Sequence, residues 1–423
     1  MVYLPRMLVK WSDIRLSINF LRKKFFYFDN FYYLCMPIWQ STITPNIHMK
    51  KVRIFAVLAA VMLLASCAPK EESFRIKRGT NLSHWLSQTN VRGAERKEHI
   101  QEDDFQRLHE LGFDHVRIPI DEVQFWDEDH NQLPQAWELL NNALDWARKY
   151  ELRVIVDLHI IRAHYFNAVN EGGDEANDLF TNTESQEWLV EMWRQLSDFM
   201  KNRSTSWVAY EMMNEPVAPE YEQWNEIVQM LHKSMRALEP ERVLVIGSNM
   251  WQGHWTMKYL RLPENDPNII LSFHYYNPQL LTHRGAPWTP AGHYEGPITY
   301  PGVMISEEDY AAAPDSVKPA LEEFRGVVWN KDKIREQMAD AIAVAERYGV
   351  QLFCGEWGVY EPVDRELAYA WTKDMLEVFD EYNIAWTTWC YDADFGFWDQ
   401  KAHDYKDKQL VELLMNNSKG LEE

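Results

Sequence analysis

From about residue 75 onward, short apolar segments alternate with longer segments whose apolar residues recur at helical spacing. Strands that alternate with helices pair in parallel through right-handed crossovers. Eight such units, in roughly 340 residues, predict an α/β fold: a (β/α)8 TIM barrel, formed as a single domain with enlarged loops after the strands. The expected strands are 75–82, 114–118, 152–158, 207–213, 242–246, 269–274, 351–354 and 384–389. The expected helices are 97–111, 135–149, 185–202, 221–238, 331–348, 364–381 and 405–415.

One feature argues against a doubly wound sheet. The turn after the first strand, 79–82, reads G-T-N-L and lacks the glycines of a phosphate-binding turn. The longest insertion, 275–330, is rich in Pro and Gly and lies between the sixth strand and its helix. In a barrel, that insertion overhangs the mouth at the carboxyl ends of the strands. The fifth crossover is weak, with only a short stretch near 252–260.

The N-terminus has the layout of an export signal. Residues 49–66 place a Met and basic residues before an apolar run of 12 residues, Ile54 to Ala65, and Cys67 follows. That run is short of the roughly 20 residues that cross a bilayer. We therefore expect a lipoprotein signal peptide at 49–66, lipidation of Cys67, and an outer-membrane lipoprotein, with exposure at the periplasmic face or at the cell surface left open. The expected divisions are an upstream segment 1–48 translated from an early start, the signal 49–66, a tether 67–74 and the barrel domain 75–420.

Composition limits the partners. The net charge of -21 argues against nucleic acid and against an anionic membrane surface, so contact with a membrane is expected only through the lipid anchor. Nineteen Trp and twenty Tyr suit flat, half-polar ligand surfaces. We expect a monomer that binds a neutral polysaccharide or oligosaccharide.

Six of the eight expected strands end in polar or aromatic residues suited to sugar chemistry. These residues are Arg117, His159, Asn214, Glu215, His274, Tyr276, Glu356 and Trp389. Glu215 and Glu356 follow the fourth and seventh strands, which face each other across a barrel mouth. Carboxyl groups about 5 Å apart suit double-displacement hydrolysis of a glycoside, whereas about 6.5–9.5 Å leaves room for direct attack by water. Both acids could instead hold Arg117 in an ion bridge, and this would be compatible with catalysis, because Arg keeps a neighbouring carboxylate ionised.

The ordered set of motifs resembles glycoside hydrolase family 5, the cellulase-like family of the 4/7 barrel clan. The matching pieces are V-R-I-P at 116–119, D-L-H at 157–159, N-E-P at 214–216, H-Y-Y at 274–276, G-E-W-G at 355–358 and the strand that ends in Trp389.

The resemblance implies a role for each matching residue. Glu215 would be the general acid/base and Glu356 the nucleophile. Asn214 would bind the sugar 2-hydroxyl, and Arg117 and Tyr276 would hold Glu356 ionised. The residues that would line the cleavage subsite are His159, His274 and, as its floor, Trp389. Because Asn214 and Glu215 are consecutive, they cannot both face inward in a regular strand, and we expect a kink there.

Further residues are candidate subsites. The candidates for sugar contacts are Trp85, Trp251, His164 and Tyr165, and Trp255 and Trp398 are additional aromatic candidates. For any single one of these aromatics, ordinary loop packing is an equally good interpretation. The loop 160–167 lacks the short glycine turn often seen in cellulases, and its Arg162 could narrow the cleft. In the long insertion, Trp288, His293 and Tyr294 could block one end of the cleft and favour attack at chain ends.

No cofactor and no metal are expected, because His159, His164, His274 and His283 lack the helical i, i+4 spacing of a metal pair. Cys354 and Cys390 are expected to be free thiols, because strand alternation places them on opposite faces if Glu356 and Trp389 both point inward.

The predicted function is a retaining glycoside hydrolase, with an endo-β-1,4-glucanase as the leading specificity. A mannanase, a xyloglucanase or an exo-acting β-glycosidase of the same family is the alternative, and a non-catalytic glycan-binding surface lipoprotein is the alternative of another class.

Overall fold

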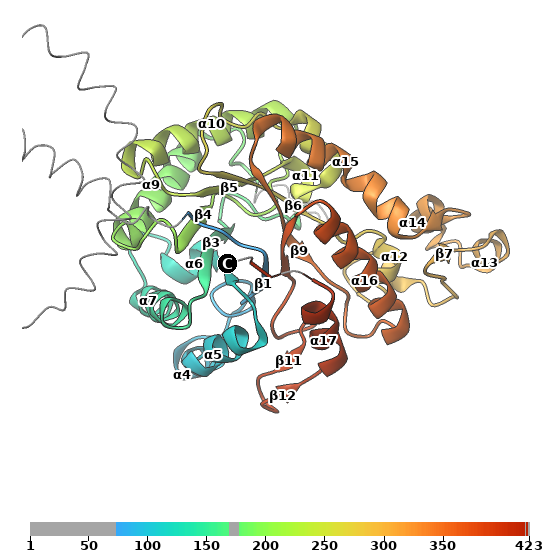
Figure 1. The fold of residues 1–423 in the computed structure, drawn as a ribbon. Helices are drawn as coiled ribbons and strands as arrows, with labels where there is room; N and C mark the ends of the chain where they lie inside the picture. Colours follow the sequence, from blue (N-terminus) through green and yellow to red (C-terminus); the bar gives the residue numbers. More distant parts are fainter. Residues whose placement is uncertain (1–72, 169–176, 419, 422–423) are drawn as a thin grey trace, which may run out of the picture. The chain divides into compact units, whose positions relative to one another are not determined.

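The computed structural model describes residues 73–168, 177–418 and 420–421 (Figure 1). The expected upstream segment, the signal peptide, Cys67 and all but the last two residues of the expected tether lie outside these ranges. Within them, every helix is too short or too polar to span a bilayer.

Eight parallel strands close into a barrel in the order β1-β10-β9-β6-β5-β4-β3-β2, which confirms the predicted fold class. The barrel strands are β1 (Arg78–Asn81), β2 (His115–Asp121), β3 (Arg153–Ile160), β4 (Val208–Glu211), β5 (Leu244–Gly247), β6 (Ile269–His274), β9 (Gln351–Trp357) and β10 (Ala385–Thr388). Figure 1 shows the helices arranged around these strands.

The helices that cover the barrel lie close to their expected positions. They are α4 (Gly93–His99), α5 (Glu102–Leu111), α7 (Pro134–Lys149), α9 (Thr183–Met200), α10 (Tyr221–Leu238), α15 (Lys331–Tyr348), α16 (Arg365–Glu381) and α17 (Lys408–Asn416). The expected helix 97–111 is divided in two, because Gln101 begins α5 with a capping box in which Asp104 accepts from the Gln101 N–H.

Short elements fill the loops. After β2 and β5 these are α6 (Glu122–Phe125), α11 (Asn249–Gln252) and the 3-10 helix η4 (His254–Tyr259). The insertion between β6 and α15 contains α12 (Gln279–Thr282), η5 (Ala291–His293), β7 (Gly302–Val303), α13 (Glu307–Ala312), α14 (Lys318–Leu321), η6 (Glu322–Phe324) and β8 (Val328–Trp329). A small hairpin, β11 (Trp398–Asp399) and β12 (Asp404–Tyr405), follows β10.

The barrel interior is apolar at one end and polar at the other. The apolar layer consists of Phe74, Ile76, Ile155, Ala209, Val243, Val245, Ile270, Phe353 and Ala385. Side chains two positions apart on a strand share a face. Ile155 is therefore followed on the inner face by Asp157 and His159, and Ala209 is followed by Glu211. The alternation alone carries charged groups inward, above the apolar layer.

Strand β9 departs from regular alternation just before its end. Its register with β6 shifts between the pairs Phe273↔Cys354 and His274↔Glu356, so Gly355 is an extra residue, as in a β-bulge. Cys354 belongs to the core between barrel and helices, and the bulge lets Glu356 point to the interior. A Cβ on Gly355 would lie 3.0 Å from Ser272 Oγ and 3.1 Å from His274 Nε2, which is why a glycine occupies this position.

Candidate active site

A cleft of about 990 Å³ opens where the barrel strands end. Its walls come from the loops after β1, β3, β4, β5, β6, β9 and β10. Six of the eight residues predicted from the strand tips line it directly: His159, Glu215, His274, Tyr276, Glu356 and Trp389.

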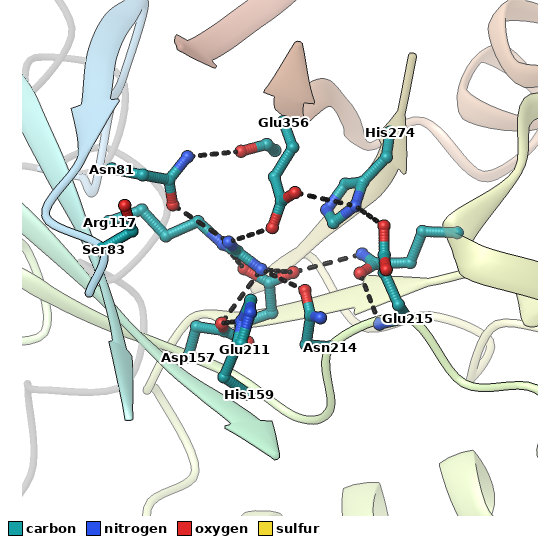
Figure 2. Close-up of polar contacts among 12 residues, drawn as sticks. Asn81, Ser83, Arg117, Asp157, His159, Glu211, Asn214, Glu215, His274 and Glu356 are labelled. Atoms are coloured by element: carbon teal, nitrogen blue, oxygen red, sulfur yellow. Dashed lines mark hydrogen bonds and ion pairs between the residues drawn. The ribbon is translucent and has the colours of Figure 1, made fainter. Parts of the chain in front are cut away.

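Arg117 is the hub of the polar network beneath the cleft (Figure 2). Its side chain is fully buried. It donates from Nε to Glu211 Oε2 at 2.7 Å and from Nη1 to Glu356 Oε1 at 2.8 Å. Its Nη2 lies 3.0 Å from Asp157 Oδ2. One guanidinium thus faces three buried carboxyl groups. Burial raises the pKa of Asp157 to about 7 and also raises the pKa of Glu211, while the charge of Arg117 acts in the opposite direction on both.

Glu356 is held through both carboxylate oxygens. Oε1 accepts from Arg117, and Oε2 accepts from the Tyr276 hydroxyl at 3.1 Å. Burial raises the pKa of Glu356, while Arg117 and the Tyr276 hydrogen bond act in the opposite direction. Arg117 therefore contacts Glu356, as the sequence predicted, and its contacts among the described residues do not include an ion pair with Glu215.

Glu215 lies in a different environment. β4 ends at Glu211, earlier than the predicted 213, and the chain leaves the strand before Asn214. Glu215 has a positive φ of 42°, which is the kink expected from two consecutive inward residues. Its Oε1 lies 2.8 Å from His274 Nδ1. Burial, and then the charge of Glu356, raise the pKa of Glu215 well above its usual range.

The two acids meet across the cleft. One oxygen of Glu215, one oxygen of Glu356 and a ring nitrogen of His274 all lie within 4.8 Å of one another. This separation corresponds to the short spacing of double displacement rather than the wide spacing of direct water attack. Burial lowers the pKa of His274 well below its ordinary value, so the ring is neutral between them.

The same three groups could in principle hold a metal ion. The expectation of a metal-free site therefore stays a prediction.

Two buried groups offer unused hydrogen-bonding atoms beside this pair. Asn214 accepts from Arg117 at 2.8 Å through Oδ1, and its amide Nδ2 has no partner among the described residues. His159 contacts Asp157 through Nδ1 at 2.7 Å, and its Nε2 likewise has none. The His159 ring lies parallel to Trp389, with centroids 5.6 Å apart. These are the atoms that a sugar hydroxyl would satisfy.

Of the aromatic candidates, Trp251, Trp255 and Trp288 line the cleft, and so does His293. The prediction was wrong for Trp85, which is fully buried and donates from Nε1 to the Arg96 carbonyl. Two further aromatic residues named above lie in the packed core: Trp398 stacks on Tyr391, and Tyr294 is also buried. The sequence of a loop does not indicate whether a Trp side chain in it faces the cleft or the core.

The loop after β3 does not narrow the cleft in the expected way. Arg162 ion-pairs with Glu122 and donates to the Trp126 carbonyl. His164 is buried, and its Nε2 accepts from the Val217 N–H at 3.2 Å, so its role is to support the loop that carries Glu215. The cleft lining contains Phe166 and Asn167 rather than Tyr165.

Sequence reasoning missed the residues that hold Arg117. Asp157 and Glu211 were not assigned, and neither was Asn81, whose Oδ1 accepts from Arg117 at 2.9 Å. Inner-face alternation with His159 was the signal that could have identified Asp157. Because acids inside apolar strands need a partner, Arg117 was the cation to expect opposite them.

Cys354 and Cys390 are buried free thiols, as predicted. The argument from alternation was wrong, however, because the bulge at Gly355 gives Cys354 and Glu356 opposite orientations. Cys390 packs with Trp389 and Phe395 beside the cleft instead of among the helices.

A closed parallel barrel with two facing acids in a Trp-lined cleft defines the protein as a glycoside hydrolase. The family model described as cellulase, glycosyl hydrolase family 5, matches residues 76–395, and the chain belongs to this family.

Relatives with assigned names cover most of the chain. Endoglucanase C of Acetivibrio thermocellus is 29% identical over 343 residues, which are 80% of this chain and 97% of that protein. Cellodextrinase A of Ruminococcus flavefaciens is 28% identical over 73% of this chain and 84% of its own length. A solved structure described as an endoglucanase superposes with a TM-score of 0.61 at 25% identity, over 80% of this chain and 97% of that one.

Proposed function

We propose that the protein is a retaining endo-β-1,4-glucanase that cleaves a β-linked glucan by double displacement. The observation that carries this proposal is the pair Glu215 and Glu356, whose oxygens lie within 4.8 Å in a common cleft but have unequal surroundings. The names of the relatives, endoglucanase and cellodextrinase, support the choice of a β-glucan as substrate.

In the first step, Glu356 acts as the nucleophile. Arg117 and Tyr276 stabilise its carboxylate, which bonds to the anomeric carbon as the glycosidic C–O bond breaks. Glu215 is the acid that keeps its proton longer, because burial and the charge of Glu356 both raise its pKa. It gives this proton to the departing oxygen.

In the second step, the roles of Glu215 reverse. Once Glu356 is esterified, its negative charge is gone, and one of the causes that raise the pKa of Glu215 disappears. Glu215 can then accept a proton from the water that attacks the glycosyl ester. Two displacements at one carbon give a product with the original anomeric configuration.

The remaining polar atoms position the sugar. Asn214 Nδ2 and His159 Nε2 are the donors or acceptors proposed for sugar hydroxyls, and the Trp389 ring is the surface on which the sugar stacks. Trp251, Trp255 and Trp288 extend the aromatic lining and support binding of several sugar units, as an endo-acting enzyme requires.

The test is hydrolysis of a panel of soluble polysaccharides, containing β-1,4-glucan, mannan and xyloglucan, by the purified protein. We expect the β-glucan to be cut internally, so that viscosity falls faster than reducing ends appear. Glu356→Ala should abolish reducing-sugar release, and NMR should show a β-configured first product. An α-configured first product would contradict the nucleophile assignment. A preference for mannan or xyloglucan, or release of sugars from chain ends alone, would contradict the proposed endo-β-1,4-glucanase specificity. Such a result would still be compatible with the double-displacement mechanism.

We also propose that the mature protein is anchored by a lipid on Cys67. The support is the signal-like segment 49–66 directly before that cysteine. Mass spectrometry of the mature N-terminus tests this proposal: an acylated Cys67 is the expected first residue, and a mature chain that retains residues 1–66 would contradict it.

A further inference from the structure

Beyond the residues that line the cleft, one fully buried amide contacts the supports of both acids. Gln252 accepts the backbone N–H of Glu215 with its Oε1 at 3.0 Å. Its Nε2 donates to Glu211 Oε1 and to Ser272 Oγ, both at 3.1 Å. Glu211 accepts a hydrogen bond from Arg117, and Arg117 also donates to Glu356. Gln252 is absent from the cleft lining, so it acts on the site without touching the substrate.

The backbone around Gln252 is unusual. Met250, Trp251 and Gln252 have φ values of 55°, 59° and 50°, so three successive residues other than glycine occupy the left-handed region. Such conformations persist only where the surroundings impose them, and they concentrate at functional sites. The site is also tightly fitted: a Cβ on Gly247 would lie 2.2 Å from Gln252 Nε2, so a glycine is needed there.

The segment that carries Gln252 is fastened to the segment that follows Glu215. The Asn249 side chain accepts from the Ala218 N–H and donates to the Ala218 carbonyl, both at 2.8 Å. The backbone N–H of Trp251 donates to the Pro216 carbonyl at 3.3 Å. Together with the Gln252 contact, these bonds hold residues 215–218 against α11. The Glu215 backbone is therefore located by α11, and β4 has ended before it.

We propose that Gln252 is a positioning residue, which fixes the backbone of Glu215 so that its carboxyl group can protonate the departing oxygen. The Nε2 bond to Glu211 fixes the orientation of the amide that presents Oε1 to the Glu215 N–H. The inference rests on the roles of Glu215 and Glu356 in the proposed function.

The test uses the dependence of rate on the leaving group. Gln252→Met keeps a side chain of similar length and removes all three hydrogen bonds. Phenyl β-cellobioside needs a proton on its departing oxygen, whereas 2,4-dinitrophenyl β-cellobioside does not. For Gln252→Met we expect kcat/KM to fall about tenfold or more on the phenyl substrate, and by less than about twofold on the dinitrophenyl substrate.

Gln124→Met is the matched control. Gln124 is also buried, accepts from Arg96 at 2.6 Å and donates to the Thr89 carbonyl at 2.7 Å, and is not part of the cleft lining. It should lower the thermal midpoint but leave the ratio of the two kcat/KM values unchanged. A purely structural role for Gln252 would make its variant behave in the same way, and an unchanged ratio in Gln252→Met would overturn the proposal.

Gln252→Glu provides a second variant in case the Met variant fails to fold. It keeps an acceptor for the Glu215 N–H, and when protonated it also has a donor toward Glu211. Activity on the phenyl substrate should therefore recover toward the unaltered enzyme as the pH is lowered. A loss that is equal at every pH and on both substrates would overturn the proposal. If the unaltered protein cleaves neither substrate nor any β-glucan, the proposed function fails, and this outcome is distinct from failure of the Gln252 proposal.

Discussion

Replacing Tyr276 with Phe isolates one interaction of the proposed nucleophile. The variant removes the hydroxyl that donates to Glu356 Oε2 and leaves the Arg117 contact to Oε1 in place. A hydrogen bond to a charged group contributes roughly 1.5–3 kcal/mol. The 3.1 Å distance is long for an O–H···O bond, which favours the lower value of about 1.5 kcal/mol. That energy corresponds to a rise of roughly one unit in the pKa of Glu356.

The sign of the effect follows from the form that reacts. Glu356 attacks as a carboxylate, so kcat/KM falls on the acidic side, where Glu356 gains a proton. Without the hydroxyl, this acidic limb should move to higher pH by about one unit, with little change on the plateau. The assay is kcat/KM against pH with 2,4-dinitrophenyl β-cellobioside, whose departure needs no proton.

Tyr275→Phe is the matched control. Tyr275 is buried, and its hydroxyl donates to Gln337 Oε1 at 2.8 Å, away from both acids. We expect its acidic limb to coincide with that of the unaltered enzyme. The reasoning is refuted if the limb stays in place in Tyr276→Phe, or if Tyr275→Phe moves it equally.

Three further outcomes are expected. Burial raises the pKa of Asp121 to about 8, so the folded state binds its proton more tightly than the unfolded chain does, and this contribution to stability is complete at low pH and is lost as the pH rises toward 8. Asp121→Asn should therefore flatten the dependence of unfolding free energy on pH by up to roughly 6 kcal/mol between acidic and mildly alkaline solution, and denaturant titrations that give the same pH dependence for both proteins would contradict this. Trp288→Ala should raise KM for a long glucan about fivefold, because it removes an aromatic surface worth about 1 kcal/mol, with kcat nearly constant; an unchanged KM would place the glucan elsewhere. Incubation with EDTA followed by gel filtration should leave kcat/KM unchanged, because Glu215, His274 and Glu356 are proposed to act as acids and their support; loss of activity that added metal restores would contradict a metal-free mechanism.

The barrel itself was readable from the sequence because its signals are local. Apolar residues recur with a different spacing in strands and in helices, and this spacing can be recognised within a short segment without knowledge of its neighbours in the fold. Helix α15 was predicted at its observed bounds. In the structure the Asn330 side chain caps its N-terminus, and Gly349 adopts the left-handed conformation at its C-terminus. The polar strand tips were equally visible, because a barrel gathers the carboxyl ends of its strands at one mouth.

The limits of the strands near the site were less predictable. β4 was expected to reach 213 and ends at Glu211, and β9 was expected to end at 354 and continues through its bulge to Trp357. In both places regular strand pairing is interrupted, and the chain contacts another strand or loop instead. Gly355 packs closely against the side chains of Ser272 and His274, and the segment after β4 is hydrogen-bonded to α11. Those partners are distant in sequence, so the local sequence pattern does not predict these contacts.

By itself, the sequence determined the barrel, the two acids at the carboxyl ends of facing strands and the family to which the chain belongs, because these depend on periodicity and on the order of short motifs. Only the tertiary structure decided which groups surround each acid. It brought Asp157, Glu211 and Glu356 onto the single guanidinium of Arg117, and it placed the amide of Gln252 under Glu215. The reason is electrostatic: the pKa of a buried carboxyl group is set by its desolvation and by charges a few ångströms away, and those distances exist only once the strands have closed.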